Sequence, residues 1–212
     1  MVIFLLPSKQ IQYFFVLLLL LLASQKNMAQ MRQVYVDVEE NNHVVKTYFY
    51  SPSEGYVAFK HWIGYTTDSG RTYIKKYITN SNVNYNNYSV NLLFGFEING
   101  VIAFNQNTLV VYGSYDNVPS ILYSTNGGNS FSLVYYSQFD QTQLGTGIMD
   151  MAFPQGNTIG YAVDKDRILK TYNGGITWAP VSVDPAVYFN NIEAVDNNTL
   201  FVMSTNYDPT RL

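Results

Sequence analysis

Thr66-Thr67-Asp68-Ser69-Gly70-Arg71-Thr72-Tyr73 is an octapeptide whose pattern recurs twice further along the chain, and this recurrence indicates the architecture. The second copy is Ser124-Thr125-Asn126-Gly127-Gly128-Asn129-Ser130-Phe131, and the third is Thr171-Tyr172-Asn173-Gly174-Gly175-Ile176-Thr177-Trp178. The shared pattern is hydroxyl, any residue, Asp or Asn, small residue, Gly, any residue, hydroxyl, aromatic. The Asp or Asn stands at positions 68, 126 and 173, which lie 58 and then 47 residues apart. Recurrence at a period of about 50 residues predicts a repeat architecture.

Each octapeptide fits a hairpin turn between two strands. An Asp or Asn side chain can accept hydrogen bonds from backbone N–H groups just ahead of it, and Gly adopts backbone conformations that other residues avoid. Three unrelated Asn-Gly turns are the simpler alternative, but matching apolar stretches precede the copies at 55–58, 109–112 and 160–163. The turn-building positions are Asp68, Gly70 and Tyr73, then Asn126, Gly128 and Phe131, then Asn173, Gly175 and Trp178.

These residues resemble the Asp-box, or bacterial neuraminidase, repeat of sialidases, sortilin-type receptors, xyloglucan-degrading glycosidases and photosystem II stability/assembly factor-like proteins. The third unit, residues 160–178, is similar to the assembly-factor-like subset in particular. Tyr73 and Phe131 stand where Trp is usual in the repeat, and Asn126 and Asn173 stand where Asp is commoner. The resemblance covers residues 44–204. It implies an all-β fold, a β-propeller of four-stranded antiparallel blades.

About three and a half blades are expected, which makes the propeller incomplete. The expected divisions are a signal peptide at 1–29, an N-terminal strand and turn at 30–43, and a partial propeller at 44–212. Its blades would span about 44–78, 92–136, 147–183 and, truncated, 189–212. The Asn-rich run 79–91 is expected to be a long exposed loop. Arg211-Leu212 aligns with Arg167-Ile168 at the start of a third strand. The sequence therefore reads as a fragment or truncated gene, the alternative being an open arc that closes against another copy.

The composition favours strands and turns and excludes several functions. Aromatic residues make up 16% of the 212 residues, 19 of them Tyr, whereas only 13% are charged. The absence of Cys excludes disulfides, thiol catalysis and Cys-ligated metals. No Lys or Arg occurs between Lys76 and Lys165, which argues against nucleic acid and anionic membrane surfaces as partners. A basic patch is linked to partner binding in assembly-factor-like proteins, so this gap limits the resemblance to the fold.

The N-terminus has the layout of an export signal. Lys9 precedes an apolar run at 11–23, which is shorter than the roughly 20 residues of a spanning helix, and small residues follow as cleavage points. We expect an exported protein, extracellular, at the cell surface or periplasmic, without membrane insertion beyond this segment. An uncleaved anchor is the alternative. Removing residues 1–29 would take away Lys9 and Lys26 and change the formal charge from −3 to −5.

Ligand-binding residues are expected on the loops at the face opposite the octapeptide turns, because rigid scaffolds present their binding residues on loops. Aromatic side chains beside Asn and carboxylates suit sugar rings or protein surfaces. The alternative is that these are ordinary loops of a chain rich in Tyr and Asn. The residues selected on this basis are Tyr85, Tyr88, Tyr115, Asp116, Phe139, Asp140 and Tyr188. The expected partner is a protein or a carbohydrate.

No catalytic residue, metal site or cofactor is assigned. The sialidase resemblance would require an arginine triad, but Arg32, Arg71, Arg167 and Arg211 lie in no such motif, and Arg71 and Arg167 read as surface residues. A glycosidase needs two carboxylates about 5 to 9 Å apart, and Asp116, Asp140, Asp150 and Glu193 are the available acids. The only histidines, His43 and His61, have no acidic neighbours at ligand spacing.

Three functions remain open at this point. The leading hypothesis is a non-enzymatic exported propeller that binds a protein or glycan. The second is a glycoside hydrolase of the sialidase superfamily type whose catalytic acids lie partly outside this sequence. The third is a structural or adhesive repeat segment of a larger cell-surface protein. Two carboxylates converging in a Tyr-lined pocket would favour the enzyme, whereas an aromatic patch without such a pair would favour binding.

Overall fold

The computed structural model describes residues 43–78, 83–86, 88–92, 95–137, 147–154, 156, 158–164, 166–183 and 187–206. All of them belong to one compact unit, Tyr35–Leu212. The leader expected at 1–29 and the N-terminal strand expected within 30–43 lie outside the described residues. Among the described residues, no helix has the length and apolar character needed to cross a membrane.

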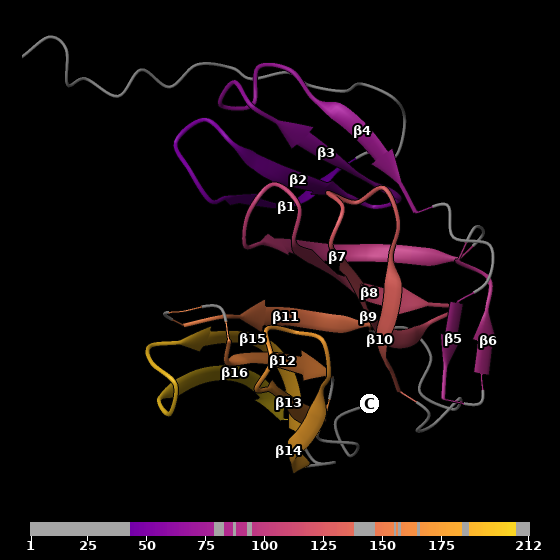
Figure 1. Ribbon diagram of the computed structural model, residues 1–212. Coiled ribbons are helices and arrows are strands. Elements are labelled where there is room, and N and C mark those ends of the chain that lie inside the picture. Colours follow the sequence, from indigo (N-terminus) through magenta and orange to yellow (C-terminus); the bar gives the residue numbers. More distant parts are fainter. Residues whose placement is uncertain are drawn as a thin grey trace, which may run out of the picture. The chain divides into compact units, whose positions relative to one another are not determined.

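Three antiparallel sheets of four strands follow one another along the chain (Figure 1), and we call them blades one, two and three. Blade one contains β1 (Val44–Phe49), β2 (Gly55–Phe59), β3 (Trp62–Thr66) and β4 (Ile74–Tyr77). Blade two contains β7 (Phe96–Ala103), β8 (Leu109–Tyr115), β9 (Val118–Ser124) and β10 (Ser132–Tyr136). Blade three contains β11 (Ile148–Ala152), β12 (Gly160–Asp164), β13 (Arg167–Thr171) and β14 (Ala179–Val183). Each strand pairs with the next one in sequence.

A two-stranded sheet follows blade three and corresponds to the first half of a further blade. Its strands are β15 (Val187–Ala194) and β16 (Leu200–Asn206), and we call it blade four. The fold class expected from the sequence, all-β with four-stranded antiparallel blades and an incomplete propeller, is confirmed. The octapeptides occupy the same place in blades one to three, because they connect β3 to β4, β9 to β10 and β13 to β14.

The Asn-rich segment between blades one and two differs from the long exposed loop expected there. It contains a short hairpin of β5 (Val83–Tyr85) and β6 (Tyr88–Val90). Asn86 takes the turn with a φ of 53°, a conformation that Asn tolerates better than most residues. Val83 and Val90 are buried against the core of blades one and two. Two Val side chains at the non-turn ends therefore anchor a segment whose polar composition resembles that of a loop.

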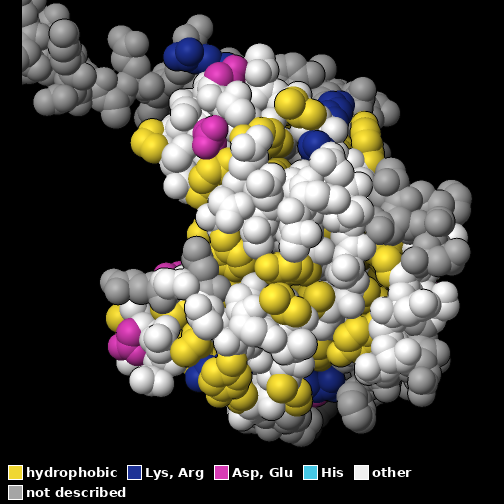
Figure 2. Space-filling view, viewed as in Figure 1, with side chains coloured by type: hydrophobic (Ala, Val, Ile, Leu, Met, Phe, Trp, Pro, Cys, Tyr) yellow, Lys and Arg dark blue, Asp and Glu magenta, His cyan; other side chains and the backbone are white. Residues whose placement is uncertain are grey.

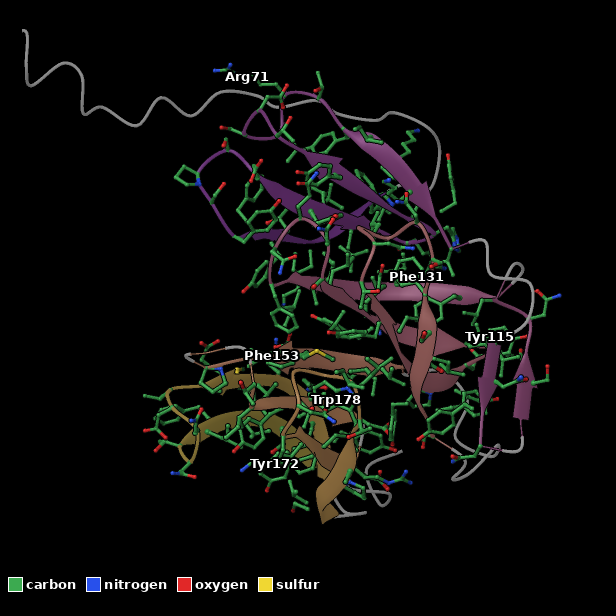
Figure 3. The ribbon with its side chains drawn as sticks, in the orientation of Figure 1. Arg71, Tyr115, Phe131, Phe153, Tyr172 and Trp178 are labelled. Carbon is green, nitrogen blue, oxygen red and sulfur yellow. The ribbon has the colours of Figure 1, made fainter. Side chains whose placement is uncertain are left out.

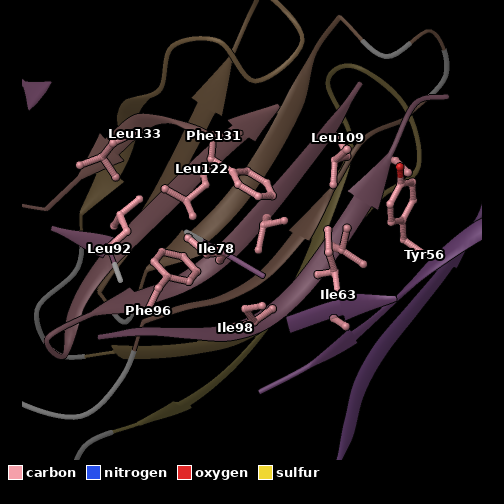
Figure 4. Packing of buried hydrophobic residues seen from close by; sticks show 14 of the residues in the cluster. Tyr56, Ile63, Ile78, Leu92, Phe96, Ile98, Leu109, Leu122, Phe131 and Leu133 are labelled. Atoms are coloured by element: carbon pink, nitrogen blue, oxygen red, sulfur yellow. The ribbon is translucent and has the colours of Figure 1, made fainter. Parts of the chain in front are cut away.

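Neighbouring blades pack face to face through their alternating side chains. Figure 4 shows the cluster between blades one and two, to which Ile63 of blade one and Leu109 and Leu122 of blade two belong. The next residue along each strand of blade two points to the other face, so Val110 and Ile121 join a second cluster with blade three. A third cluster joins blades three and four. Each fully buried Val, Ile or Leu side chain stabilises the fold by about 1.5–3 kcal/mol.

The first strands of the four blades share a bulge. β1 contacts β7, and β11 contacts both β7 and β15. The pairing with the second strand shifts at Val44/Lys46, Ile98/Gly100, Ile148/Asp150 and Phe189/Asn191. A bulge inserts one residue and turns the following side chain in a new direction. The residues Lys46, Gly100, Asp150 and Asn191 therefore occupy one equivalent position in successive blades.

Candidate functional site

The strands have two chemically different ends. At one end lie the octapeptides together with the turns between first and second strands, and we call it the octapeptide face. At the other end, which we call the opposite face, lie the turns between second and third strands and the connections from blade to blade. The β5–β6 hairpin belongs to the first of these connections, and those predicted ligand-binding residues that the structure describes lie in the turns, connections and strand ends of the opposite face.

Hydrogen bonds explain why the octapeptides form tight turns. In the third copy, the Thr171 hydroxyl accepts a hydrogen bond from the Gly175 N–H at 3.0 Å and donates one to Asn173 Oδ1 at 3.0 Å. Asn173 Oδ1 also accepts from the Thr177 N–H at 2.9 Å. The first and second copies repeat this arrangement around Asp68 and Asn126. Gly70, Gly128 and Gly175 all have positive φ, at 81°, 78° and 91°.

Each octapeptide is also bound to the neighbouring turn of its own blade. The N–H that follows the Asp or Asn donates to a carbonyl in the turn between the first and second strands. The three bonds run from Ser69 to Ser53 at 2.9 Å, from Gly127 to Asn107 at 2.8 Å and from Gly174 to Thr158 at 2.8 Å. In the first copy, hydrogen bonds led by the one from the Thr72 N–H lower the pKa of Asp68 to about 2. The Asp and Asn side chains of the octapeptides therefore stabilise the turns.

The aromatic residue that ends the octapeptide packs in the apolar layer on one face of its blade. Phe131 and Trp178 are buried, and the Trp178 indole N–H donates to the Gly175 carbonyl at 3.0 Å. Phe153 stands edge-on to Trp178 with ring centroids 5.9 Å apart, and both residues are labelled in Figure 3. Tyr73 is half-buried against Trp62 and Phe59 on the side of blade one away from blade two. The turn-building and aromatic residues of the octapeptides therefore stabilise the blades.

A group of tyrosines gathers on the opposite face. Tyr85, Tyr115 and Tyr136 are half-buried and all pack against the cluster between blades one and two. Tyr115, labelled in Figure 3, lies at the end of β8, and a Cβ at Gly95 would stand 3.1 Å from its ring. Burial raises the pKa of Tyr85. We call these three residues the tyrosine cluster.

Exposed polar residues on tight turns border the tyrosine cluster. Asp116 and Asn117 form the β8–β9 turn, with φ values of 49° and 63°, and the Asp116 N–H donates to the Gly95 carbonyl at 3.4 Å. Asn84 and Asn86 are exposed on the β5–β6 hairpin. The backbone of these turns is held in uncommon conformations, which fixes the direction of the side chains.

The other predicted ligand-binding residues do not belong to the tyrosine cluster. Tyr188 is half-buried near the start of β15 in blade four, and Tyr88 begins β6. Phe139 and Asp140 lie outside the described residues. The structure therefore packs Tyr85 and Tyr115 from the predicted set against the same core cluster and adds Tyr136, which sequence reasoning missed. Tyr136 is the last residue of β10, directly before the next connection, and that position could have identified it.

A buried acid lies between blades two and three on the same face. The Asp164 carboxylate is 3% exposed and accepts a hydrogen bond from the Tyr135 hydroxyl at 3.1 Å. Arg167 Nη1 lies 3.9 Å from Asp164 and donates to the Ser137 hydroxyl at 2.9 Å. Burial raises the pKa of Asp164 to about 6. The expectation that Arg167 is a surface residue is wrong, since its side chain is 14% exposed and links two blades.

A second buried acid joins all four blades. Asp150, weighed in the sequence as a loop or strand-end acid, lies in β11 and forms an ion pair with Lys46 of β1. Its other contacts are the Tyr112 hydroxyl at 3.3 Å and the N–H of Ile192 at 3.2 Å. The Tyr112 side chain occupies the space beside Gly100, where a Cβ would overlap its hydroxyl. Burial, followed by the charge of Asp150, raises the pKa of Tyr112.

The acids that could act in catalysis differ in their exposure and their partners. Asp116 and Glu193 are exposed, whereas Asp150 and Asp164 are bound to partners within the fold. Within the part of the chain that the structure describes, no three His, Cys, Asp or Glu side chains are grouped so that they could hold a metal ion. His43 and His61 are both exposed. The opposite face thus offers aromatic and amide groups for contact.

Comparison with known proteins places the fold. No family model matches the sequence, and no curated protein matches it. Among solved structures, an ancestral GH74 enzyme is 16% identical with a TM-score of 0.59 over 83% of this chain and 24% of its own. A GH74 enzyme from Niastella koreensis is 18% identical with a TM-score of 0.53 over 76% of this chain and 26% of its own.

A third solved structure, YCF48 bound to a D1 peptide, is 16% identical with a TM-score of 0.47 over 76% of this chain and 50% of its own. The chain thus spans about a quarter of the length of the GH74 enzymes that it matches, and half of YCF48. The two GH74 structures, together with the repeated four-stranded sheets, show that this chain has the fold of a β-propeller.

Proposed function

We propose that this chain is a non-enzymatic β-propeller that binds a protein or a glycan through its opposite face. The observation that carries the proposal is the tyrosine cluster with the polar turns beside it. Half-buried tyrosines are rigid, and their ring faces and hydroxyls contact sugar rings or protein surfaces at low entropic cost. The exposed amides of Asn84 and Asn86 and the carboxylate of Asp116 supply hydrogen bonds around them.

The charge distribution narrows the class of ligand. No Lys or Arg lies between Lys76 and Lys165 in the sequence, a span that includes the whole tyrosine cluster, and Lys60 of the β2–β3 turn on the same face is paired with Glu97 at 3.0 Å. On the side of the molecule seen in Figure 2, Lys, Arg, Asp and Glu side chains are few, and hydrophobic side chains form patches among other side chains and backbone. A neutral glycan or a neutral to basic protein segment suits such a surface better than an anionic ligand.

Two further features belong to the same proposal. We infer that the octapeptides are Asp boxes of the neuraminidase type, which their equivalent positions and shared hydrogen bonds support. We also propose that residues 1–29 direct export to the cell surface, the periplasm or the medium. Fractionation of cells that express the full chain tests this second point, and retention in the cytoplasm would contradict it.

Binding can be tested by screening the full chain against a glycan array and a peptide library, followed by calorimetry with the best ligand. Asp116→Ala and Asn84→Ala should weaken that ligand at least about fivefold, as expected for lost polar contacts. Tyr172→Ala is the matched control, because Tyr172 is 64% exposed but lies on the octapeptide face. Equal loss in all three variants, or loss only in Tyr172→Ala, would contradict binding at the opposite face.

Hydrolysis of a glycan is the second candidate function, and one observation favours it. The pKa of Asp164, raised by burial to about 6, lies in the range of a general acid. Its side chain would have to become accessible, because it is 3% exposed here. Release of reducing sugar from neutral polysaccharides, abolished by Asp164→Asn, would support this function over binding alone.

A further inference from the structure

The second and third octapeptides contain a chemically reactive pair of residues. In each, an exposed Asn is followed directly by Gly, as Asn126-Gly127 and Asn173-Gly174. In an Asn-Gly pair, the Gly nitrogen can attack the side-chain amide carbon because no side chain on Gly hinders it. The attack forms an N–Cγ bond and breaks the Cγ–Nδ2 bond, and the displaced group leaves as ammonia with the proton of the Gly nitrogen. Water then opens the cyclic imide to aspartate or isoaspartate.

The folded turn holds every atom that this reaction must move. The attacking nitrogen of Gly174 donates its proton to the Thr158 carbonyl at 2.8 Å, and that of Gly127 donates to the Asn107 carbonyl at 2.8 Å. The departing Nδ2 of Asn173 donates to the Thr177 hydroxyl at 2.9 Å. In the second copy, Asn126 Nδ2 donates to the Ser130 hydroxyl at 2.8 Å. The side-chain oxygens accept backbone hydrogen bonds at 2.9 Å, which fix the orientation of each amide.

The first octapeptide shows what the aspartate product would do. Asp68 stands at the same position, and its Oδ1 accepts from the Thr72 N–H at 2.9 Å, as the Asn oxygens do in the other copies. Its Oδ2 accepts from the Thr72 hydroxyl at 2.8 Å. The hydroxyl of Thr177 or Ser130 accepts from Asn but can rotate to donate to Asp. The same turn therefore accommodates either side chain.

We propose that Asn126 and Asn173 are latent deamidation sites, protected while the turn is folded and converted to functional Asp turns when it opens. Each conversion adds one negative charge to the octapeptide face. The opposite face is not altered, so the proposal is independent of the proposed function. Isoaspartate, which lengthens the main chain by one carbon, does not fit the turn.

The full chain is incubated at neutral pH either folded or in guanidinium chloride, and peptide mass spectrometry follows the deamidation of each Asn. In the folded chain we expect both sites to react at least about tenfold more slowly, since two hydrogen bonds of each turn must break first. Ser130→Ala should accelerate the reaction at Asn126 alone, and Thr177→Val should accelerate it at Asn173 alone. Each copy thus serves as the control for the other within one molecule.

Asn126→Asp and Asn173→Asp provide the second measurement and do not depend on the deamidation rate. Both variants should unfold within a few degrees of the unchanged chain, whereas Asn126→Ala and Asn173→Ala should lower the melting temperature clearly. Equal deamidation rates in the folded and denatured chain would overturn the protection. Melting temperatures of the Asp variants as low as those of the Ala variants would overturn the acceptance of the product.

Discussion

At the scale of single residues, the two buried acids, Asp150 and Asp164, differ in how well their negative charge is compensated by neighbouring groups. Asp150 accepts hydrogen bonds from two blades and an ion pair from a third, so its charge is compensated. Asp164 has a hydroxyl donor and a guanidinium at 3.9 Å, but burial has the larger effect on its pKa and raises it. Protonation of Asp164 should therefore favour folding, whereas the fold already supplies Asp150 with a cation and two hydrogen-bond donors.

Lys46→Met tests the compensation of Asp150. The substitution keeps most of the length of the side chain but leaves a carboxylate of 11% exposure without its cation, and we expect a loss of about 2 kcal/mol in the free energy of unfolding. Lys46→Met/Asp150→Asn should recover part of that loss, because the amide oxygen can still accept from the Ile192 N–H. Chemical denaturation of both variants measures the difference, and equal stability of the two would show that the charge is not the cause.

The pH dependence of stability tests Asp164. Its pKa is 3.8 unfolded and about 6 folded, so the folded chain binds the proton more tightly. Above both values the carboxylate is charged in both states and burial costs stability, whereas below both it is neutral. The free energy of unfolding should therefore rise as the pH falls from neutral towards 3.8, by up to about 3 kcal/mol. Asp164→Asn lacks this rise, and parallel pH profiles of the two chains would refute the assignment.

At the scale of elements, the octapeptide turn can be predicted from the sequence because its stabilising interactions are local. Its Asx-type hydrogen bonds and positive φ values involve residues within a few positions of each other, so their chemistry is readable without knowing the fold. The β5–β6 hairpin is different. Its two Val side chains are buried in the cluster between blades one and two, and β5 contacts β10 of blade two. The Asn-rich composition around them nevertheless indicates a loop.

Thr171→Val tests the turn as an element. The hydroxyl is buried and bonds the N–H groups of Asn173 and Gly175, so its removal leaves donors without acceptors and should cost about 1–3 kcal/mol. Thr177→Val removes an exposed hydroxyl of the same octapeptide and should cost less. Thermal unfolding compares the two variants, and an equal cost would mean that the buried hydroxyl has no special part in the turn.

The candidate site shows the same division between local and distant causes. Tyr85 and Tyr115 are recognisable as aromatic residues at strand ends, and the structure brings both into the tyrosine cluster. The ion pair of Lys46 with Asp150 joins residues 104 positions apart, and only the stacking of the blades makes them neighbours. Arg167 likewise reads as a surface residue until β10 is placed beside it. Sequence patterns predict turns and the alternation of apolar and polar residues along strands. Contacts between blades depend on the assembled fold and cannot be predicted in this way.

At the scale of the whole molecule, the blades leave apolar side chains on a free surface. Phe201 and Met203 of β16 are 67% and 68% exposed on blade four, and exposed apolar patches on strands promote association. We expect residues 30–212 to self-associate, and Phe201→Gln/Met203→Gln to reduce this. Sedimentation velocity measures the effect, with Tyr172→Gln as an exposed control on the octapeptide face. A monomeric unchanged chain would contradict the expectation.

Native-state hydrogen exchange at Gly70, Gly128 and Gly175 measures whether the three octapeptides are equivalent turns of successive blades. Each of these N–H groups donates to a buried hydroxyl, at 2.9 Å from Thr66, 2.9 Å from Ser124 and 3.0 Å from Thr171. We predict strong protection at all three, similar between blades and lost when the hydroxyl is removed. Fast exchange at any of them, or protection that survives loss of the hydroxyl, would contradict the account.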